Sequence, residues 1–284
     1  QMENLLETQE ALFEMSRREL VEMDSMRGAQ EAVSEMSRQE LLAAHEKLKQ
    51  SYEAKLTAVN EKNELQMIFG KFISPEVVEY LMQRDGIKKL MGEKKDLTVL
   101  FADLRGFTAM SENMEPQKVV VLLNEFFNEL TETIIQHNGI IDKYSGDNIM
   151  AIFGAPLDMP DHHEAAILAA VGMQEKFAVI KRNWHTLYGV SIGLGIGLNC
   201  GPAIAGNLGS YHKISYTVIG DIVNTAARFE QLATDGQIVC GKYLHMRLRD
   251  EFLSGNNLSI ENLGETSIKG KTGSYRIYNI RKNT

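Results

Sequence analysis

Hydrophobic residues recur at spacings of three, four and seven along residues 1–68, a stretch that contains no proline and a single glycine, Gly28. This spacing and the scarcity of helix-breaking residues predict one long helix. The apolar series changes register between pieces, which favours an imperfect coiled coil over a rigid rod. We interpret it as a parallel dimeric stalk that transmits a signal. The alternative is a solitary amphipathic helix that folds back on the rest of the chain.

A short linker helix is predicted at residues 76–83. Ser74 is a favoured N-cap residue and Pro75 suits the first helical position, so the pair marks the start of a helix. Gly86 and Gly92 mark loops after it. The domains expected from these boundaries are a helical coiled coil at 1–68, a helical linker at 69–93 and a globular domain at 94–284.

From residue 95 onward, short apolar runs alternate with amphipathic stretches of helical period. Two of the apolar runs flank residues 145–147 and predict a β-hairpin. Asp161, with Glu164 three residues later, predicts a capping box at a helix start. Strands that alternate with helices, together with a hairpin, predict an α/β sandwich of ferredoxin-like character. The elements expected are strands at 97–102, 140–144, 148–153, 190–198, 213–219, 237–239, 257–263 and 275–280, and helices at 117–137, 162–181, 221–232 and 242–249.

The composition of the 284-residue chain argues against several functional classes. A net charge of -8 disfavours a nucleic-acid partner. No apolar run approaches the roughly 20 residues that span a bilayer, and no signal peptide is visible. Cys200 and Cys240 form neither a metal-ligand spacing nor a disulfide framework, so we expect a cytoplasmic location. Because the sequence begins at Gln1 rather than methionine, we expect a fragment of a longer protein that has an upstream sensor, with or without a membrane attachment.

Two acidic motifs lie beside glycine turns at the ends of predicted strands. Residues 101–108 (FADLRGFT) contain Asp103, and residues 143–147 (KYSGD) end on Asp147. Two carboxylates brought together repel unless a cation lies between them. Oxygen ligands with no His or Cys nearby suit Mg²⁺ or Mn²⁺, with phosphate as a co-ligand. Either aspartate taken alone is more typical of a strand-end residue that caps a turn.

Three further motifs have a structural and a functional interpretation. Glycines alternate with apolar residues in 191–197 (SIGLGIG), as in a buried strand, so we expect them to admit a closely packed neighbour rather than a nucleotide. His162 and His163 suggest a metal site, but adjacent helical side chains diverge by about 100°, which favours a surface helix cap. Residues 269–273 (KGKTG) are by themselves a solvated basic turn.

Asn224 and Arg228 are four residues apart and lie on one face of the helix that is predicted after the strand-to-helix turn at 216–221. An arginine beside an asparagine on an inward face needs an anionic partner. That partner is either a ligand or an acidic side chain in a structural ion pair, and the sequence leaves both open.

Over about residues 94–281, the sequence resembles the catalytic domain of the class III adenylyl cyclases. The resemblance rests on the order and separation of the two acidic motifs, the turn at 216–221 with the helix that follows it, and the KGKTG segment. The resemblance implies that Asp103, Asp147 and the backbone carbonyl of Leu104 hold two Mg²⁺ ions, for which Mn²⁺ can substitute. It also implies that the backbone around Phe107 and Thr108 lies against the phosphates of the substrate, ATP.

The resemblance assigns the remaining substrate contacts as well. Lys143 matches the lysine that binds an adenine ring nitrogen. Thr217 stands where many members have an aspartate that accepts from the adenine amino group, and a threonine-type subgroup has threonine there. Guanylyl cyclases typically have glutamate and cysteine at these two places, so this pair favours ATP. Asn224 matches the residue that orients the ribose, Arg228 the one that stabilises charge on the α-phosphate, and Lys269 the lysine on the outer phosphates.

In this family the metal aspartates and the base-binding residues of one protomer serve different active sites, so a homodimer builds two sites and a monomer none. The expected function is an adenylyl cyclase that converts ATP to 3′,5′-cyclic AMP and pyrophosphate by two-metal catalysis and is regulated through the N-terminal coiled coil. The alternatives are a guanylyl cyclase and a non-catalytic cyclase-like dimer or sensor module. A diguanylate cyclase is disfavoured because its acidic Gly-Gly signature is missing.

Overall fold

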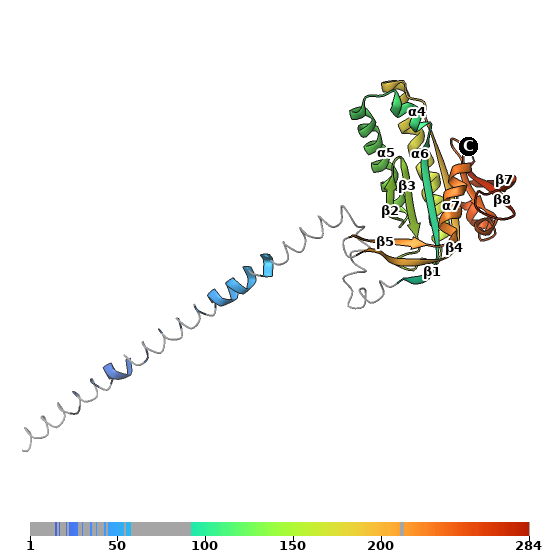
Figure 1. Ribbon diagram of the computed structural model, residues 1–284. Helices are drawn as coiled ribbons and strands as arrows, with labels where there is room; N and C mark the ends of the chain where they lie inside the picture. The colour runs from blue at the N-terminus through green and yellow to red at the C-terminus, as the bar shows by residue number, and fades with distance from the viewer. Residues whose placement is uncertain are drawn as a thin grey trace, which may run out of the picture. The chain divides into compact units, whose positions relative to one another are not determined.

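The computed structural model describes residues 92–210 and 213–283 and, nearer the N-terminus, residues 15, 17, 21, 23–27, 30, 35, 38, 43, 45–53 and 55–57. The described residues before 58 are helical, as predicted. The linker helix expected at 76–83 and the loop expected at Gly86 lie outside the described residues. The chain divides into two units, Gln1–Ile68 and Phe69–Thr284 (Figure 1). Among the helices described, none combines the length and hydrophobicity needed to cross a bilayer.

The second unit contains a mixed sheet and six described helices. Its strands are β1 Glu93–Arg105, β2 Ile140–Ser145, β3 Asn148–Phe153, β4 Gly193–Ser210, β5 Lys213–Ile219, β6 Ile238–Gly241, β7 Leu258–Ser267 and β8 Ser274–Lys282. Its helices are α4 Phe107–Glu112, α5 Pro116–Gln136, α6 His162–Tyr188, α7 Asp221–Leu232, α8 Lys242–His245 and α9 Asp250–Gly255. The strand order is β2-β3-β1-β4-β6-β8-β7, and β5 pairs with β4 off this path. The predicted α/β class is confirmed.

The two faces of the sheet are covered by different helices. Large side chains of α5 and α6, among them Phe126, Phe177 and Trp184, pack on one face with Leu100 of β1. The shorter α7 and the strand β5 cover the other face, where Val99 is buried. Figure 1 shows α5 and α6 on one side of β1 and α7 on the other. Because strand side chains alternate between faces, the odd-numbered residues of β1 face α7.

The glycine-rich segment of β4 allows α7 to lie directly on the sheet. A Cβ at Gly197 would lie 2.5 Å from the Ala226 carbonyl oxygen and closer still to the Glu230 backbone nitrogen. A Cβ at Gly195 would lie 2.5 Å from Nε of Arg105. The expectation that these glycines admit a close neighbour is therefore confirmed, and the neighbours are α7 and an arginine of β1.

Several element boundaries differ from the prediction: β1 extends to 93–105 and α6 to residue 188, beyond the expected 97–102 and 162–181, and two further differences have identifiable reasons. The strand expected at 190–198 begins at Gly193 and continues to Ser210, because it pairs first with β1 and then with β5. The helix expected at 242–249 ends at His245, where the chain tightens into i→i+3 bonds such as Arg247 N to Leu244 O.

The predicted capping box and the surface position of His162 are both wrong. Asp161 precedes α6 but makes no side-chain capping bond, and Glu164 instead accepts a 2.8 Å hydrogen bond from Arg249. His162 is 3% exposed, and its Nδ1 lies 2.7 Å from Oγ1 of buried Thr98 on β1. This strand partner satisfies the buried imidazole, which local sequence could not show. Burial lowers the pKa of His162 to about 4.

Candidate active site

The two predicted metal aspartates lie side by side. Asp103, near the end of β1, is paired with Asn148, the first residue of β3. Asp147 directly precedes Asn148 in the turn between β2 and β3. The Asn148 side-chain amide also approaches Asp103 Oδ1, at 3.5 Å. The sheet register therefore brings together two carboxylates that are 44 positions apart in the sequence, 147 against 103.

The electrostatics of this pair favour a bound cation. Burial raises the pKa of Asp103, although the charge of Arg105 and hydrogen bonds from Asn148 and Arg105 act in the opposite direction. Burial also raises the pKa of Asp147, and the neighbouring Asp103 charge raises it further. The local donors therefore do not fully offset the burial and mutual repulsion of the two carboxylates. A divalent cation between them would lower both pKa values and hold both groups ionised.

Leu104, which follows Asp103 on β1, places its backbone N–H and carbonyl groups beside the two aspartates. Its N–H donates to the Asp147 carboxylate. The N–H and C=O of one strand residue face the same neighbouring strand, so its carbonyl oxygen also faces the Asp147 turn. Across the described part of the chain, no group of three or more His, Cys, Asp or Glu side chains is placed to hold a metal. Two carboxylates with a backbone carbonyl are thus the donor set that the structure offers, and hard oxygen ligands suit Mg²⁺ and Mn²⁺.

Phe107 and Thr108 open the short helix α4, which the sequence did not predict. Gly106 turns the chain from β1 into this helix with a φ of 86°, a left-handed conformation that favours glycine. The first N–H groups of a helix have no intrahelical partner. The Gly106 turn therefore places these N–H groups directly after the strand that carries Asp103.

Arg105 has a prominent place in the site that the sequence did not reveal. Its guanidinium donates to Asp103 Oδ2 at 2.8 Å and to Glu230 Oε1 at 2.5 Å. Glu230, on α7, is 4% exposed, and burial raises its pKa against the opposing effect of Arg105. Because side chains alternate along a strand, the sequence could have placed Arg105 on the same face of β1 as Asp103. Nothing in the local sequence indicated its acceptor Glu230 on α7, which is 125 residues away.

The helix α7 carries Asn224 and Arg228, as predicted. Asn224 is exposed. Arg228 donates to the neutral side chain of Gln231 at 2.8 Å. Within the described part of the chain, Arg228 forms no ion pair with an acidic side chain, so the structural ion pair that the sequence left open is not observed. Its positive charge remains available to an anionic ligand.

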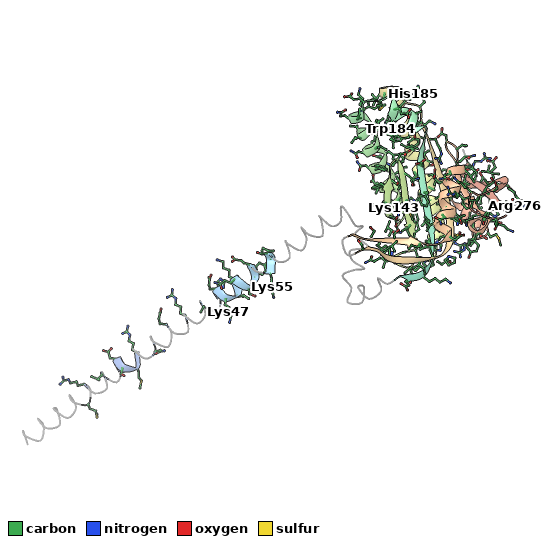
Figure 2. All side chains as sticks on the ribbon, in the orientation of Figure 1. Lys47, Lys55, Lys143, Trp184, His185 and Arg276 are labelled. Carbon is green, nitrogen blue, oxygen red and sulfur yellow. The ribbon has the colours of Figure 1, made fainter. Side chains whose placement is uncertain are left out.

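The two predicted base-binding residues lie on different strands. Lys143 (labelled in Figure 2) is on the edge strand β2, next to an irregularity in the pairing of β2 with β3. Its side chain is 57% exposed. Its Nζ lies 3.2 Å from the buried Asp142 carboxylate. Thr217 is on β5 opposite Gly206 of β4 and is partly buried. No hydrogen bond or ion pair joins Lys143 to Thr217 in the described structure.

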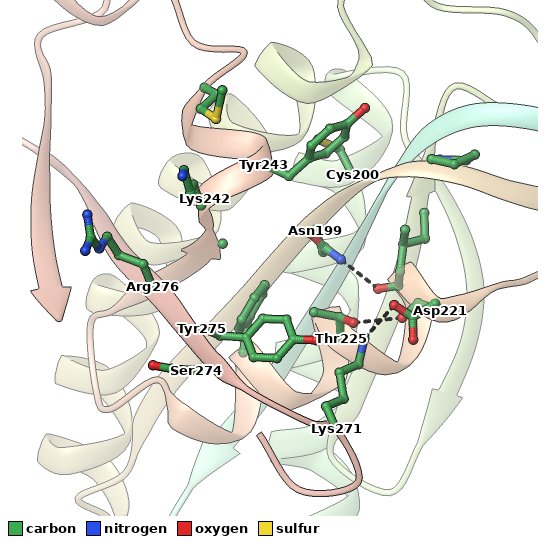
Figure 3. A pocket seen from close by; sticks show the side chains of 15 residues that line it. Asn199, Cys200, Asp221, Thr225, Lys242, Tyr243, Lys271, Ser274, Tyr275 and Arg276 are labelled. Atoms are coloured by element: carbon green, nitrogen blue, oxygen red, sulfur yellow. Dashed lines mark hydrogen bonds and ion pairs between the residues drawn. The ribbon is translucent and has the colours of Figure 1, made fainter. Parts of the chain in front are cut away.

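The KGKTG segment approaches α7 through its second lysine. Lys269, the predicted phosphate ligand, is exposed in the loop between β7 and β8. Lys271 forms a 2.5 Å ion pair with Asp221 at the start of α7 and lies 5.6 Å from the centre of the Tyr275 ring. Lys271 and Asp221 line a pocket of about 650 Å³ between α7, α8 and the start of β8. Figure 3 shows the two side chains in this pocket. Lys271 therefore attaches the loop to α7. Among the described residues Lys269 forms no ion pair, so its ammonium group is open to a ligand.

Known proteins share this fold. The sequence profile described as the adenylate and guanylate cyclase catalytic domain matches residues 90–282. The crystal structure of the adenylyl cyclase CyaB from P. aeruginosa is 28% identical, covers 69% of this chain and 98% of its own, and has a TM-score of 0.64. That of the guanylyl cyclase Cya2 is 31% identical, covers 67% of this chain and 94% of its own, and has a TM-score of 0.61.

An uncharacterized protein of Mycobacterium tuberculosis is 32% identical over 186 residues, which make up 66% of this chain and 32% of that protein. The chain thus spans about a third of the length of the first curated relatives it matches. The similar solved structures include both an adenylyl and a guanylyl cyclase, so the similarity does not distinguish between the two nucleotide bases. Since the profile covers well over half of the sequence, this chain belongs to the family of adenylate and guanylate cyclase catalytic domains.

Proposed function

We propose that the protein converts ATP to 3′,5′-cyclic AMP and pyrophosphate at two equivalent active sites formed between two copies of the chain. The observation that carries the proposal is the proximity of Asp103 and Asp147, which the pairing of Asp103 with Asn148 brings about and where burial raises both pKa values. Paired carboxylates in such a setting suit divalent cations bound together with a triphosphate.

The donor set fits the metal ions that the sequence predicts. Asp103, Asp147 and the Leu104 carbonyl would hold them. When bound, two divalent ions such as Mg²⁺ or Mn²⁺ would supply activation of the ribose 3′-hydroxyl and neutralisation of the triphosphate charge. The N–H groups at Phe107 and Thr108 would bind phosphate oxygens next to this corner.

The residues of α7 would act on the reacting groups. Arg228 has no acidic partner among the described residues, so its guanidinium is available to stabilise negative charge as it develops on the α-phosphate. The exposed amide of Asn224, one turn earlier, would orient the ribose. Lys269 would bind the outer phosphates while Lys271 keeps its loop attached to Asp221.

The preference for ATP rests on the polarity of the base-binding groups. Adenine offers a ring-nitrogen acceptor and an amino donor, which match the ammonium donor of Lys143 and the hydroxyl acceptor of Thr217. Guanine presents a ring N–H and a carbonyl oxygen at the same positions, and a lysine cannot accept from that N–H. Because a hydroxyl both donates and accepts, Lys143 carries most of the discrimination.

The directions of side chains on α7 support active sites shared between protomers. Arg228 and Glu230 are two residues apart, so their side chains project about 200° apart around the helix. Glu230 is the residue that contacts Arg105 beside Asp103. Arg228 therefore projects away from the aspartates of its own protomer and suits those of a partner.

We infer that residues 1–68 form the coiled coil of this dimer and that residues 69–93 link it to the catalytic domain at 94–284. The large apolar residues described in the N-terminal helix are half exposed or more, for example Val21 at 65% and Leu48 at 70%. A helix with exposed apolar residues at helical spacing gains stability by pairing with a second copy. The pairing would raise the effective concentration of one catalytic domain near the other.

Mixing two inactive variants tests the shared sites. Asp103→Ala removes a metal ligand, and Arg228→Ala removes the group on the α-phosphate, so each homodimer should lose turnover. The mixed dimer has one site with both lesions and one with neither. We expect cyclic AMP formation to recover to as much as half the wild-type rate per mixed dimer. A mixture that stays inactive after confirmed subunit exchange would refute shared active sites.

A further inference from the structure

Arg105 connects Asp103 with the helix α7 of the same protomer. In the proposed dimer these two elements serve different active sites. The Arg105 guanidinium makes four hydrogen bonds. One goes to Asp103 on β1, and the other three go to the Glu230 carboxylate and to the carbonyl oxygens of Glu230 and Ala233. Ala233 is the C-cap residue of α7. One side chain thus contacts a proposed metal ligand and the end of the helix that carries Arg228.

The contacts with α7 have the form of a helix C-cap. The last carbonyl groups of a helix have no intrahelical partner, and a cation near them also interacts favourably with the helix dipole. α7 has no basic residue in its own last turn. The guanidinium of Arg105, 2.8 Å from the Ala233 carbonyl oxygen, supplies that cation from the neighbouring strand.

The surroundings fix Arg105 in this position. The absence of a side chain at Gly195 leaves the space that the guanidinium occupies. The Glu230 side chain is 5% exposed, and the Arg105 side chain is 25% exposed. Removing the ionic partner of a buried carboxylate is strongly destabilising. The arginine therefore cannot leave without disturbing both the strand and the helix.

We propose that Arg105 is a positioning residue that sets the carboxylate of Asp103 and the last turn of α7 at the same time. The inference rests on the proposed function, in which Asp103 serves one active site of the dimer and Arg228 of the same protomer serves the other. One side chain then adjusts both active sites. Its loss damages one site through the aspartate and the other through the helix.

Mixed dimers separate these two effects, with the Asp103→Ala and Arg228→Ala mixture as the benchmark. Arg105→Met removes all four donors and keeps an unbranched side chain. Mixed with Arg228→Ala protein, it leaves one site whose Arg228 comes from the Arg105→Met chain, so this mixture reports on α7. Mixed with Asp103→Ala protein, it leaves one site whose aspartates come from the Arg105→Met chain, so this mixture reports on Asp103.

We expect both mixtures to reach at most about a tenth of the benchmark rate, since misplacing a catalytic group by about 1 Å costs roughly a hundredfold. Benchmark activity in either mixture overturns the dual role. If the benchmark itself stays inactive after subunit exchange, shared active sites are refuted, and the claim that one arginine serves both sites is refuted with them.

Amide hydrogen exchange at residues 229–233 tests the helix cap without turnover. We expect Arg105→Met to raise exchange there by at least about tenfold, because the last turn opens locally once its cap is lost. The matched control is Arg249→Met, which removes an exposed arginine that pairs with Glu164. It should leave this exchange unchanged. If amide exchange at residues 229–233 is unchanged in Arg105→Met, Arg105 does not cap α7.

Glu230→Gln covers the case in which Arg105→Met does not fold. It keeps the shape of the side chain and one carbonyl acceptor but removes the charge that pairs with Arg105. We expect deficits in the same two mixtures and faster exchange in the same turn, each smaller than for Arg105→Met. Wild-type values in both measurements contradict the positioning role.

Discussion

Replacing Gly197 with alanine tests the close contact on which the placement of α7 depends. A Cβ at this position would lie 2.5 Å from the Ala226 carbonyl oxygen and closer still to the Glu230 backbone nitrogen. Both atoms belong to the backbone of α7, so no side-chain rotation relieves the overlap. The φ of Gly197 is outside the left-handed region, so alanine is strained there by lack of space alone.

The size of the effect follows from overpacking. An added carbon in a well-packed core costs about 1–3 kcal/mol, and more where the backbone must move. For a domain of 150–250 residues, each kcal/mol lowers Tm by about 2–4 °C, so Tm should fall by about 2–12 °C. The loss of chain entropy in the unfolded state opposes this by about 0.4–1 kcal/mol. Turnover should fall as well, because displacement of α7 moves Asn224 and Arg228.

Urea and thermal unfolding of the two alanine variants Gly197→Ala and Gly255→Ala provide the assay. Gly255, at the end of α9, is the matched control, since a Cβ there would have no atom within 4 Å and its φ is not left-handed. Gly255→Ala should be neutral or stabilising by up to about 1 kcal/mol. If Gly197→Ala is as stable and active as wild type, α7 does not lie against β4 as described.

Three further predictions follow from the same structure. Asp103→Ala and Asp147→Ala should each lower kcat by on the order of a thousandfold with the fold intact, and near-wild-type turnover would exclude a metal role. Lys143→Glu with Thr217→Cys should lower the ratio of kcat/KM for ATP over that for GTP by about 10- to 100-fold, and an unchanged ratio removes both residues from the base pocket. Because the pKa of His162 falls from 6.5 to about 4 on folding, its unfolded form binds a proton first as pH falls. Stability should therefore drop between pH 6.5 and 4 by up to about 1.4 kcal/mol per unit, and His162→Gln should show a smaller slope in urea titrations; equal slopes contradict this.

Elements with a strong local pattern were predictable from the sequence. The bounds expected for β3 and for α7, 148–153 and 221–232, are those observed. The role of the β4 glycines also followed from sequence, because glycine on one face of a strand indicates a close neighbour. α4 was missed because six residues after a left-handed glycine are too short for helical periodicity to show.

Features set by distant partners could not be predicted locally. The buried ring of His162 has its hydrogen-bond partner in Thr98, 64 residues earlier in the sequence. Arg105 lies within the acidic motif, yet its acceptors on α7 are 125 and 128 residues away. The contact of Lys271 with Asp221 likewise depends on how the β7–β8 loop folds over α7. The roles assigned to the site residues came from family resemblance and stay predictions.

The identity of the cyclic product is the most direct test of the central claim. Purified protein is incubated with equal concentrations of Mn-ATP or Mn-GTP, and initial rates of cyclic AMP and cyclic GMP formation are measured, with Asp103→Ala as the control. The account predicts cyclic AMP and pyrophosphate in equal amounts, a kcat/KM for ATP above that for GTP, and neither product from the control. Cyclic GMP as the main product, or no cyclic product at any protein concentration, would contradict it.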